Sequence, residues 1–146
     1  MPLYTVTRTS SALSTANDSM TIIASASKPL RVYIVDIKGM GTTSAANEVL
    51  LSRSTGGTTG GGAITPSPTN TGSAAASFTV NTTWSAQPTL GVTLWRFGVN
   101  ANGAVDKFVA IPGAEISVPV SGQLSIRSAS GTSSVTMNAL VEEVDG

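Results

Sequence analysis

The chain has 146 residues, of which 40% are hydrophobic and only 11% are charged, and its eight Lys and Arg balance its eight Asp and Glu. This composition allows one ordinary hydrophobic core and argues against disorder of the whole chain, which needs low hydrophobicity and high net charge. The neutral balance, with basic residues scattered singly, also argues against nucleic-acid binding, because neutralising phosphates requires a basic patch.

The first residues lack a basic region followed by a long apolar run, so we expect no signal peptide. The most apolar stretch, residues 30–37, contains Arg31 and Asp36 and is far shorter than the roughly 20 residues of a membrane helix. The chain also has no Cys, so disulfides and thiolate metal sites are excluded. We therefore expect a soluble protein, without a membrane partner, that packing alone stabilises.

Strands are predicted at several places in the first half of the chain. Residues 3–7 are an expected edge strand, within a segment, residues 1–19, that we interpret as an N-terminal arm. The run at residues 31–37 is β-branched and apolar on both faces, which predicts a central strand covered on both sides. Further strands are expected at residues 20–26, 48–54 and 77–84.

Residues 54–74 are the most biased stretch of the chain. They are rich in Gly, Ser, Thr and Pro and offer almost nothing to a core. We expect a long exposed loop between two strands, of the kind that often carries binding residues.

The second half of the chain alternates with the two-residue period of a half-buried strand, most clearly at Val135, Met137, Ala139 and Val141. The same rhythm marks residues 90–94, 116–120 and 123–127. Turn residues separate these runs: Asn102-Gly103 predicts a tight hairpin, and Pro112-Gly113, Ser121-Gly122 and Ser130-Gly131 predict further turns.

Many short strands with frequent turn signals are typical of a sandwich or barrel. We expect one domain over residues 1–146, all-β, a jelly-roll-like β-sandwich of about 8 to 10 antiparallel strands.

Catalytic chemistry has few candidates in this sequence. With no His or Cys, the usual nucleophile and base pairs and the main transition-metal ligands are missing, so we expect neither an enzyme nor a metal or cofactor site. The Gly-rich residues 56–62 lack the Lys that a phosphate-binding loop requires. Glu142 and Glu143 are adjacent on a strand and point to opposite faces, which favours a solubilising end of the chain over a glycosidase pair.

Four residues are candidates for an interface between subunits: Trp84, Trp95, Arg96 and Phe97. Strand alternation places Trp95 and Phe97 on one face and Arg96 on the other, so both faces of this strand are in use. Trp and Arg are enriched where protein interfaces derive most of their binding energy, which favours a subunit contact over a sugar-stacking platform.

Three segments carry a resemblance to a known group of proteins: DIKGMGTTSAANE at residues 36–48, RSTGGTTGGG at residues 53–62 and LWRFGVN at residues 94–100. In these, and in style over most of its length, the chain resembles small virion proteins of tailed bacteriophages that look like head decoration (cement) proteins.

The resemblance implies a jelly-roll homotrimer on the capsid surface of a virion, made in the host bacterial cytoplasm, that binds the phage major capsid protein and stabilises the head. The polar residues 9–19 of the arm would then order only on the shell. One alternative is a tail, baseplate or receptor-binding module that contacts host saccharide. Another is a carbohydrate-active enzyme or lectin, in which Asp106 and Glu115 would be the carboxylates to test.

Overall fold

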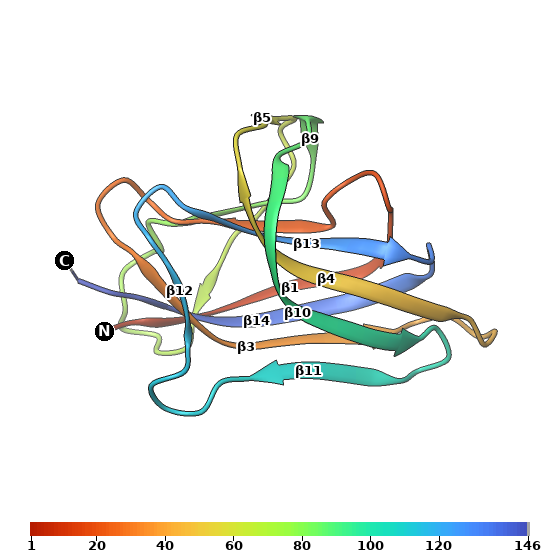
Figure 1. Cartoon of the computed structure of the whole chain (residues 1–146). Helices are drawn as coiled ribbons and strands as arrows, with labels where there is room; N and C mark the ends of the chain where they lie inside the picture. The colour runs from red at the N-terminus through yellow and green to blue at the C-terminus, as the bar shows by residue number, and fades with distance from the viewer. Residues whose placement is uncertain (146) are drawn as a thin grey trace.

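The computed structural model describes residues 1–145, which form two stacked antiparallel sheets and a small third sheet (Figure 1). No helix among these residues is long and apolar enough to cross a membrane. The all-β prediction is confirmed, and the two large sheets pack as a β-sandwich.

Sheet A contains six strands in the order β11-β3-β14-β1-β7, with β12 also paired to β3. Their bounds are β1 Leu3–Ala12, β3 Leu30–Gly39, β7 Ser67–Pro68, β11 Val105–Val109, β12 Ile116–Val118 and β14 Ser134–Glu143.

Sheet B also contains six strands, in the order β10-β4-β13-β2-β8-β6. Their bounds are β2 Met20–Ile23, β4 Ala46–Thr55, β6 Ala63–Ile64, β8 Thr79–Asn81, β10 Thr89–Asn100 and β13 Gln123–Ser130. A separate pair, β5 Thr58–Thr59 and β9 Trp84–Ala86, projects beyond the sandwich (Figure 1).

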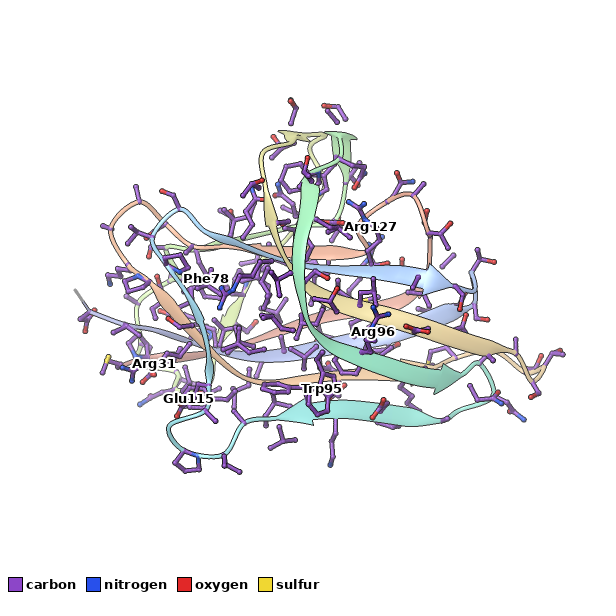
Figure 2. All side chains as sticks on the ribbon, in the orientation of Figure 1. Arg31, Phe78, Trp95, Arg96, Glu115 and Arg127 are labelled. Carbon is purple, nitrogen blue, oxygen red and sulfur yellow. The ribbon has the colours of Figure 1, made fainter. Side chains whose placement is uncertain are left out.

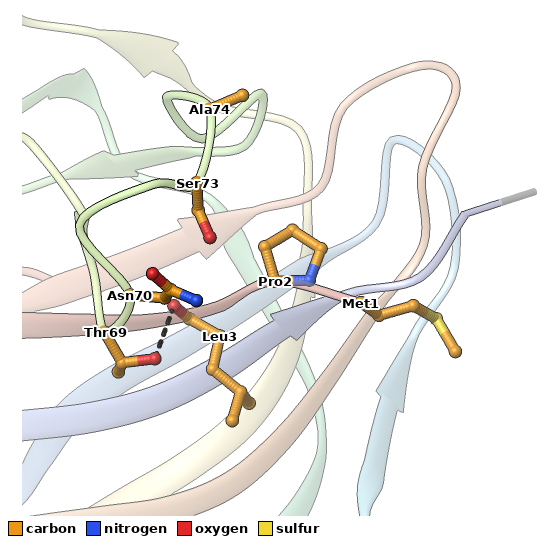
Figure 3. A pocket seen from close by; sticks show the side chains of 7 residues that line it. All are labelled: Met1, Pro2, Leu3, Thr69, Asn70, Ser73 and Ala74. Atoms are coloured by element: carbon orange, nitrogen blue, oxygen red, sulfur yellow. Dashed lines mark hydrogen bonds between the residues drawn. The ribbon is translucent and has the colours of Figure 1, made fainter.

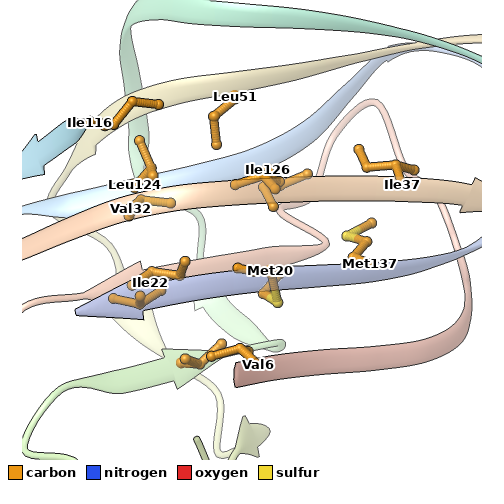
Figure 4. Close-up of a cluster of buried hydrophobic side chains, with 14 of the residues drawn as sticks. Val6, Met20, Ile22, Val32, Ile37, Leu51, Ile116, Leu124, Ile126 and Met137 are labelled. Atoms are coloured by element: carbon orange, nitrogen blue, oxygen red, sulfur yellow. The ribbon is translucent and has the colours of Figure 1, made fainter. Parts of the chain in front are cut away.

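The core lies between the two sheets because alternate residues of each long strand point inward. On β14 the predicted alternation is confirmed, since Val135, Met137, Ala139 and Val141 are all buried. These side chains meet residues of sheet B in the core, and Figure 4 labels five of the latter: Met20, Ile22, Leu51, Leu124 and Ile126. Each fully buried aliphatic side chain of this size contributes roughly 1.5–3 kcal/mol.

Two aromatic pairs link the two sheets, one beside β1 and β8 and the other between the edge strands β10 and β11. On one side Tyr4 of β1 packs edge-on against Phe78, with ring centroids 5.5 Å apart. On the other side Trp95 of β10 packs edge-on against Phe108 of β11 at 5.4 Å. Burial raises the pKa of the Tyr4 hydroxyl, as does the nearby Glu143 carboxylate, and this hydroxyl donates to the Ala74 carbonyl at 3.0 Å.

The prediction that residues 31–37 are covered on both faces is wrong. Val32, Val35 and Ile37 are buried, but Tyr33 and Ile34 on the other face are only half-buried. The register slips here, because Leu140 pairs with Ile34 while Val141 pairs with Val32, which leaves Tyr33 as an extra residue. This bulge places two successive apolar residues on the outer face and explains why the run is apolar throughout.

The expected N-terminal arm is also wrong, because most of its first half is β1, paired with β14 from Leu3 to Ala12. Its alternation is the physical reason: Tyr4 and Val6 are buried while Thr5 and Thr7 are exposed. Residues 54–74 differ from a plain loop as well, since they include β5, β6 and β7, which pair with β9, β8 and β1.

The turn at Asn102-Gly103 exists, with Gly103 at a φ of 77°, but it does not join a hairpin. Here β10 pairs with β4 of sheet B and β11 pairs with β3 of sheet A, so the chain crosses between the sheets. The sequence does not predict the strand β11, because its exposed residues include Val105 and Val109 and its apolar pattern is therefore weak.

Gly39 permits the close approach of the crossing segment to β3. A Cβ at this position would lie 2.2 Å from the Asn100 carbonyl oxygen and 2.7 Å from backbone atoms of Ala101. Gly39→Ala is therefore expected to lower the free energy of unfolding by about 1–3 kcal/mol, as overpacking usually does. Gly98→Ala is the matched control, because a Cβ there meets nothing within 4 Å. Urea unfolding of both variants tests this, and equal stabilities would contradict it.

Candidate interaction surfaces

Trp84 and Phe97, two of the four predicted interface residues, are parts of the fold. Phe97 is fully buried in the core. Trp84 is 8% exposed, and its Nε1 donates to Thr21 Oγ1 at 3.0 Å. Its ring also lies beside Gly57, which has a φ of 87° and at which a Cβ would lie 2.8 Å from the ring, so there is no room for a side chain. The prediction that Trp84 and Phe97 are interface residues is wrong, since both side chains are buried within the chain.

Trp95 and Arg96 remain at the surface and point to opposite faces of β10 (Figure 2). Trp95 is 43% exposed at the open side of the sandwich. Arg96 forms an ion pair with Glu48 on the outer face of sheet B, beside a hollow over Gly98. The structure therefore brings only Trp95 and Arg96 to places that another molecule can reach.

Asp106 and Glu115, the carboxylates of the enzyme hypothesis, cap backbone groups. Asp106 accepts hydrogen bonds from the amide of Gly98 on β10 at 2.9 Å and from that of Lys107 on β11 at 2.8 Å. Glu115 accepts from the Gly113 amide at 3.1 Å, and backbone amides, its own first, lower the pKa of its carboxyl. Asp106 thus ties the edge strands of the two sheets together.

An ion pair that no sequence pattern indicates links the buried Asp18 to the largely buried Arg127 of β13, with 2.7 Å between Oδ1 and Nε. Asp18 Oδ2 accepts from Thr21 Oγ1 at 2.6 Å, and Arg127 Nη2 donates to the Pro88 carbonyl at 3.1 Å. Together with the Trp84 contact to Thr21, this network fastens the segment around β9 to the outer face of sheet B.

The two C-terminal glutamates point to opposite faces, as predicted, with Glu142 half-buried on the outer face of sheet A and Glu143 buried. Glu142 accepts from the Tyr33 hydroxyl at 2.7 Å, which raises the pKa of that hydroxyl, and lies 3.8 Å from Arg31. Glu143 is 1% exposed and accepts from the Ser77 amide at 3.0 Å and from the Ser77 hydroxyl. The interpretation of Glu143 as a solubilising residue is therefore wrong.

The outer face of sheet A carries an ordered pattern of side chains. Strand pairing aligns its residues in rows across the sheet. We call these the central row (Val109, Ile34, Leu140 and Thr5), the Asp36 row (Lys107, Asp36, Asn138 and Thr7) and the Arg31 row (Arg31, Glu142 and Leu3).

Polar side chains on this face are largely satisfied by one another. Thr7 Oγ1 donates to Asn138 Oδ1, and Asn138 Nδ2 donates to Asp36 Oδ1, both at 2.8 Å. A shallow hollow lies between the central and Asp36 rows, lined by residues that include Ile34, Asp36, Asn138 and Leu140. The face therefore combines an apolar row with a polar border that already pairs its own groups.

A second hollow lies where β1 begins, between Met1, Pro2, Leu3 and the turn that holds Thr69, Asn70 and Ser73 (Figure 3). Thr69 Oγ1 donates to the Leu3 carbonyl at 3.2 Å across it. No charged side chain lines this hollow, so it offers little to hold a ligand. Among residues 1–145, no three Asp or Glu side chains are grouped so as to hold a metal ion.

Comparison with known proteins gives no relatives: no protein-family model, curated protein or solved structure matches this chain.

The Asp18–Arg127 pair is expected to stabilise the fold strongly, because removing one partner leaves the other charge buried. Asp18→Ala should lower the free energy of unfolding by about 3–5 kcal/mol. Glu48→Ala breaks the exposed pair with Arg96 and is the control, with an expected loss of about 1 kcal/mol or less. Chemical denaturation measures both, and a loss of similar size in the two variants would refute the structural role of Asp18.

Proposed function

We propose that the chain is a non-enzymatic structural protein of a phage virion, a capsid decoration protein that binds the assembled head and stabilises it. The observation that carries this proposal is the outer face of sheet A, an ordered surface with an apolar row and charges of both signs. Such a surface suits contact with other protein subunits, because most of the polar groups that would be desolvated already have partners.

The strand order supports a jelly roll as the specific architecture. Sheet A places β1, β14, β3 and β11 side by side, and sheet B places β2, β13, β4 and β10 side by side. Successive long strands change sheets at every step except from β4 to β10. This alternation corresponds to the eight strands and two Greek keys of a jelly roll, an architecture that viral capsid domains use.

The partners in this proposal are the phage major capsid protein and other copies of the chain, assembled as a homotrimer on the capsid surface. Exposed apolar side chains outside sheet A's central row, among them Trp95, Val92 and Ile111, provide further contact area for subunits.

A second candidate is a tail or receptor-binding module that contacts host saccharide. The exposed ring of Trp95, held against Phe108, favours it, since aromatic faces stack on sugar rings. In that case Trp95→Ala abolishes glycan binding, and antibody labelling of virions marks the tail rather than the head.

The decoration role is tested with phage heads that lack the protein. We expect these heads to release their DNA at a lower temperature, or after a milder osmotic shock, than complete heads. Adding back the purified chain should restore resistance, whereas adding the same chain after heat denaturation should not. Heads that survive equally well with and without the protein would exclude the decoration role.

A further inference from the structure

The outer face of sheet A has an internal symmetry that follows from the bulge in β3. Because Tyr33 is the extra residue, Arg31 and Asp36 both lie two paired positions from Ile34, on opposite sides of the central row. Their neighbours on β14, Glu142 and Asn138, lie two positions on either side of Leu140. Each of these steps is roughly 7 Å along the strand.

A half-turn about an axis that runs along the central row exchanges the two flanking rows. A second copy laid face to face by this rotation brings its central row onto the same row of the first. Its Arg31 then lies over Asp36 of the first copy, and its Glu142 lies over Asn138. The same rotation places Asp36 of the second copy under Arg31 of the first, because every contact in a two-fold interface occurs twice.

We propose that this face is an isologous interface between two copies of the chain, with two reciprocal Asp36–Arg31 ion pairs around a central apolar row. The occupant is a second copy, because the half-turn places Arg31 of each copy opposite Asp36 of the other. The charge pattern of this face is therefore complementary to itself. The rotation reverses the strand direction but leaves the strands aligned, which is the common packing of two sheets.

The hollow on this face has a matching projection under the same symmetry. It lies on the Asp36 side of the central row, between Ile34 and Leu140 on one side and Asp36 and Asn138 on the other. Tyr33 lies on the Arg31 side, and its hydroxyl reaches across to Glu142 on β14. The half-turn therefore carries Tyr33 of one copy onto the hollow of the other.

The free groups on the face suit this contact. Asp36 Oδ1 accepts from Asn138 within its own chain, while Oδ2 has no partner among the described residues and faces the second copy. Arg31, with its side chain 46% exposed, lies 3.8 Å from Glu142, so its remaining donors are available to another carboxylate. Two extra ion pairs therefore form without breaking those present in each chain.

Reciprocal charge reversal tests the interface on the purified full chain by sedimentation equilibrium. This two-fold contact is separate from the contacts within the proposed homotrimer, so we expect wild-type chains, or their trimers, to associate in pairs. Asp36→Arg or Arg31→Asp should raise the dissociation constant of this pairing at least about tenfold, because like charges then face each other. The double variant Asp36→Arg/Arg31→Asp exchanges the signs again and should restore association. Arg96→Asp with Glu48→Arg, the same exchange on sheet B, should leave association unchanged.

Thermal melts establish that each variant is folded, and Val109→Asp is a second probe if a reversal at Asp36 unfolds the chain. Val109 is 52% exposed and lies at the end of the central row, so its substitution adds like charges to the interface without disturbing the core. A wild-type monomer at about 100 µM overturns the inference, since a specific pair of this kind binds more tightly. So does an oligomer that neither Val109→Asp nor the reversals weaken. The inference does not rest on the virion role, and its failure would leave the test on phage heads unaffected.

Discussion

Burial of alternate side chains between two sheets is the constraint on which this structure depends. Without disulfides, and with few charges, the chain obtains its stability from inward-facing residues such as Val6, Ile37, Leu51 and Ile126. A strand that slipped by one residue would turn its whole apolar set to solvent, so register is strongly specified. The slip in β3 adds its extra residue, Tyr33, only on the outer face, so the buried face of this strand keeps its alternation.

Polar side chains hold in place the parts that the core does not reach. Asp106 links the edge strands β10 and β11, and Asp18 with Arg127 fastens the segment around β9. Glu143 does the same for Ser77 near β8. The few charged residues are thus used largely within the chain, which leaves surfaces whose recognition depends on shape and on a small number of ion pairs.

The sequence predicts the strands whose side chains alternate, but not the strands and contacts that depend on residues distant in sequence. The pattern of β14 predicts its buried face correctly, because period-2 alternation reflects local geometry. Nothing local marks Asp18 as the partner of Arg127, or Trp84 as a buried donor to Thr21. The exposed β11 and the short strands of residues 54–74 are not predicted for the same reason, because their pairing depends on strands that are distant in sequence. The rows on sheet A need the register of four strands and so were not predictable.

Both the proposed virion role and the contact between copies depend on the outer face of sheet A. A cryo-electron density map of the virion tests them most directly. We expect density for the chain on the head, with the central row covered by a neighbouring copy and Arg31 beside the Asp36 of that copy. Density confined to the tail, or copies whose outer face of sheet A is open to solvent, would contradict this expectation.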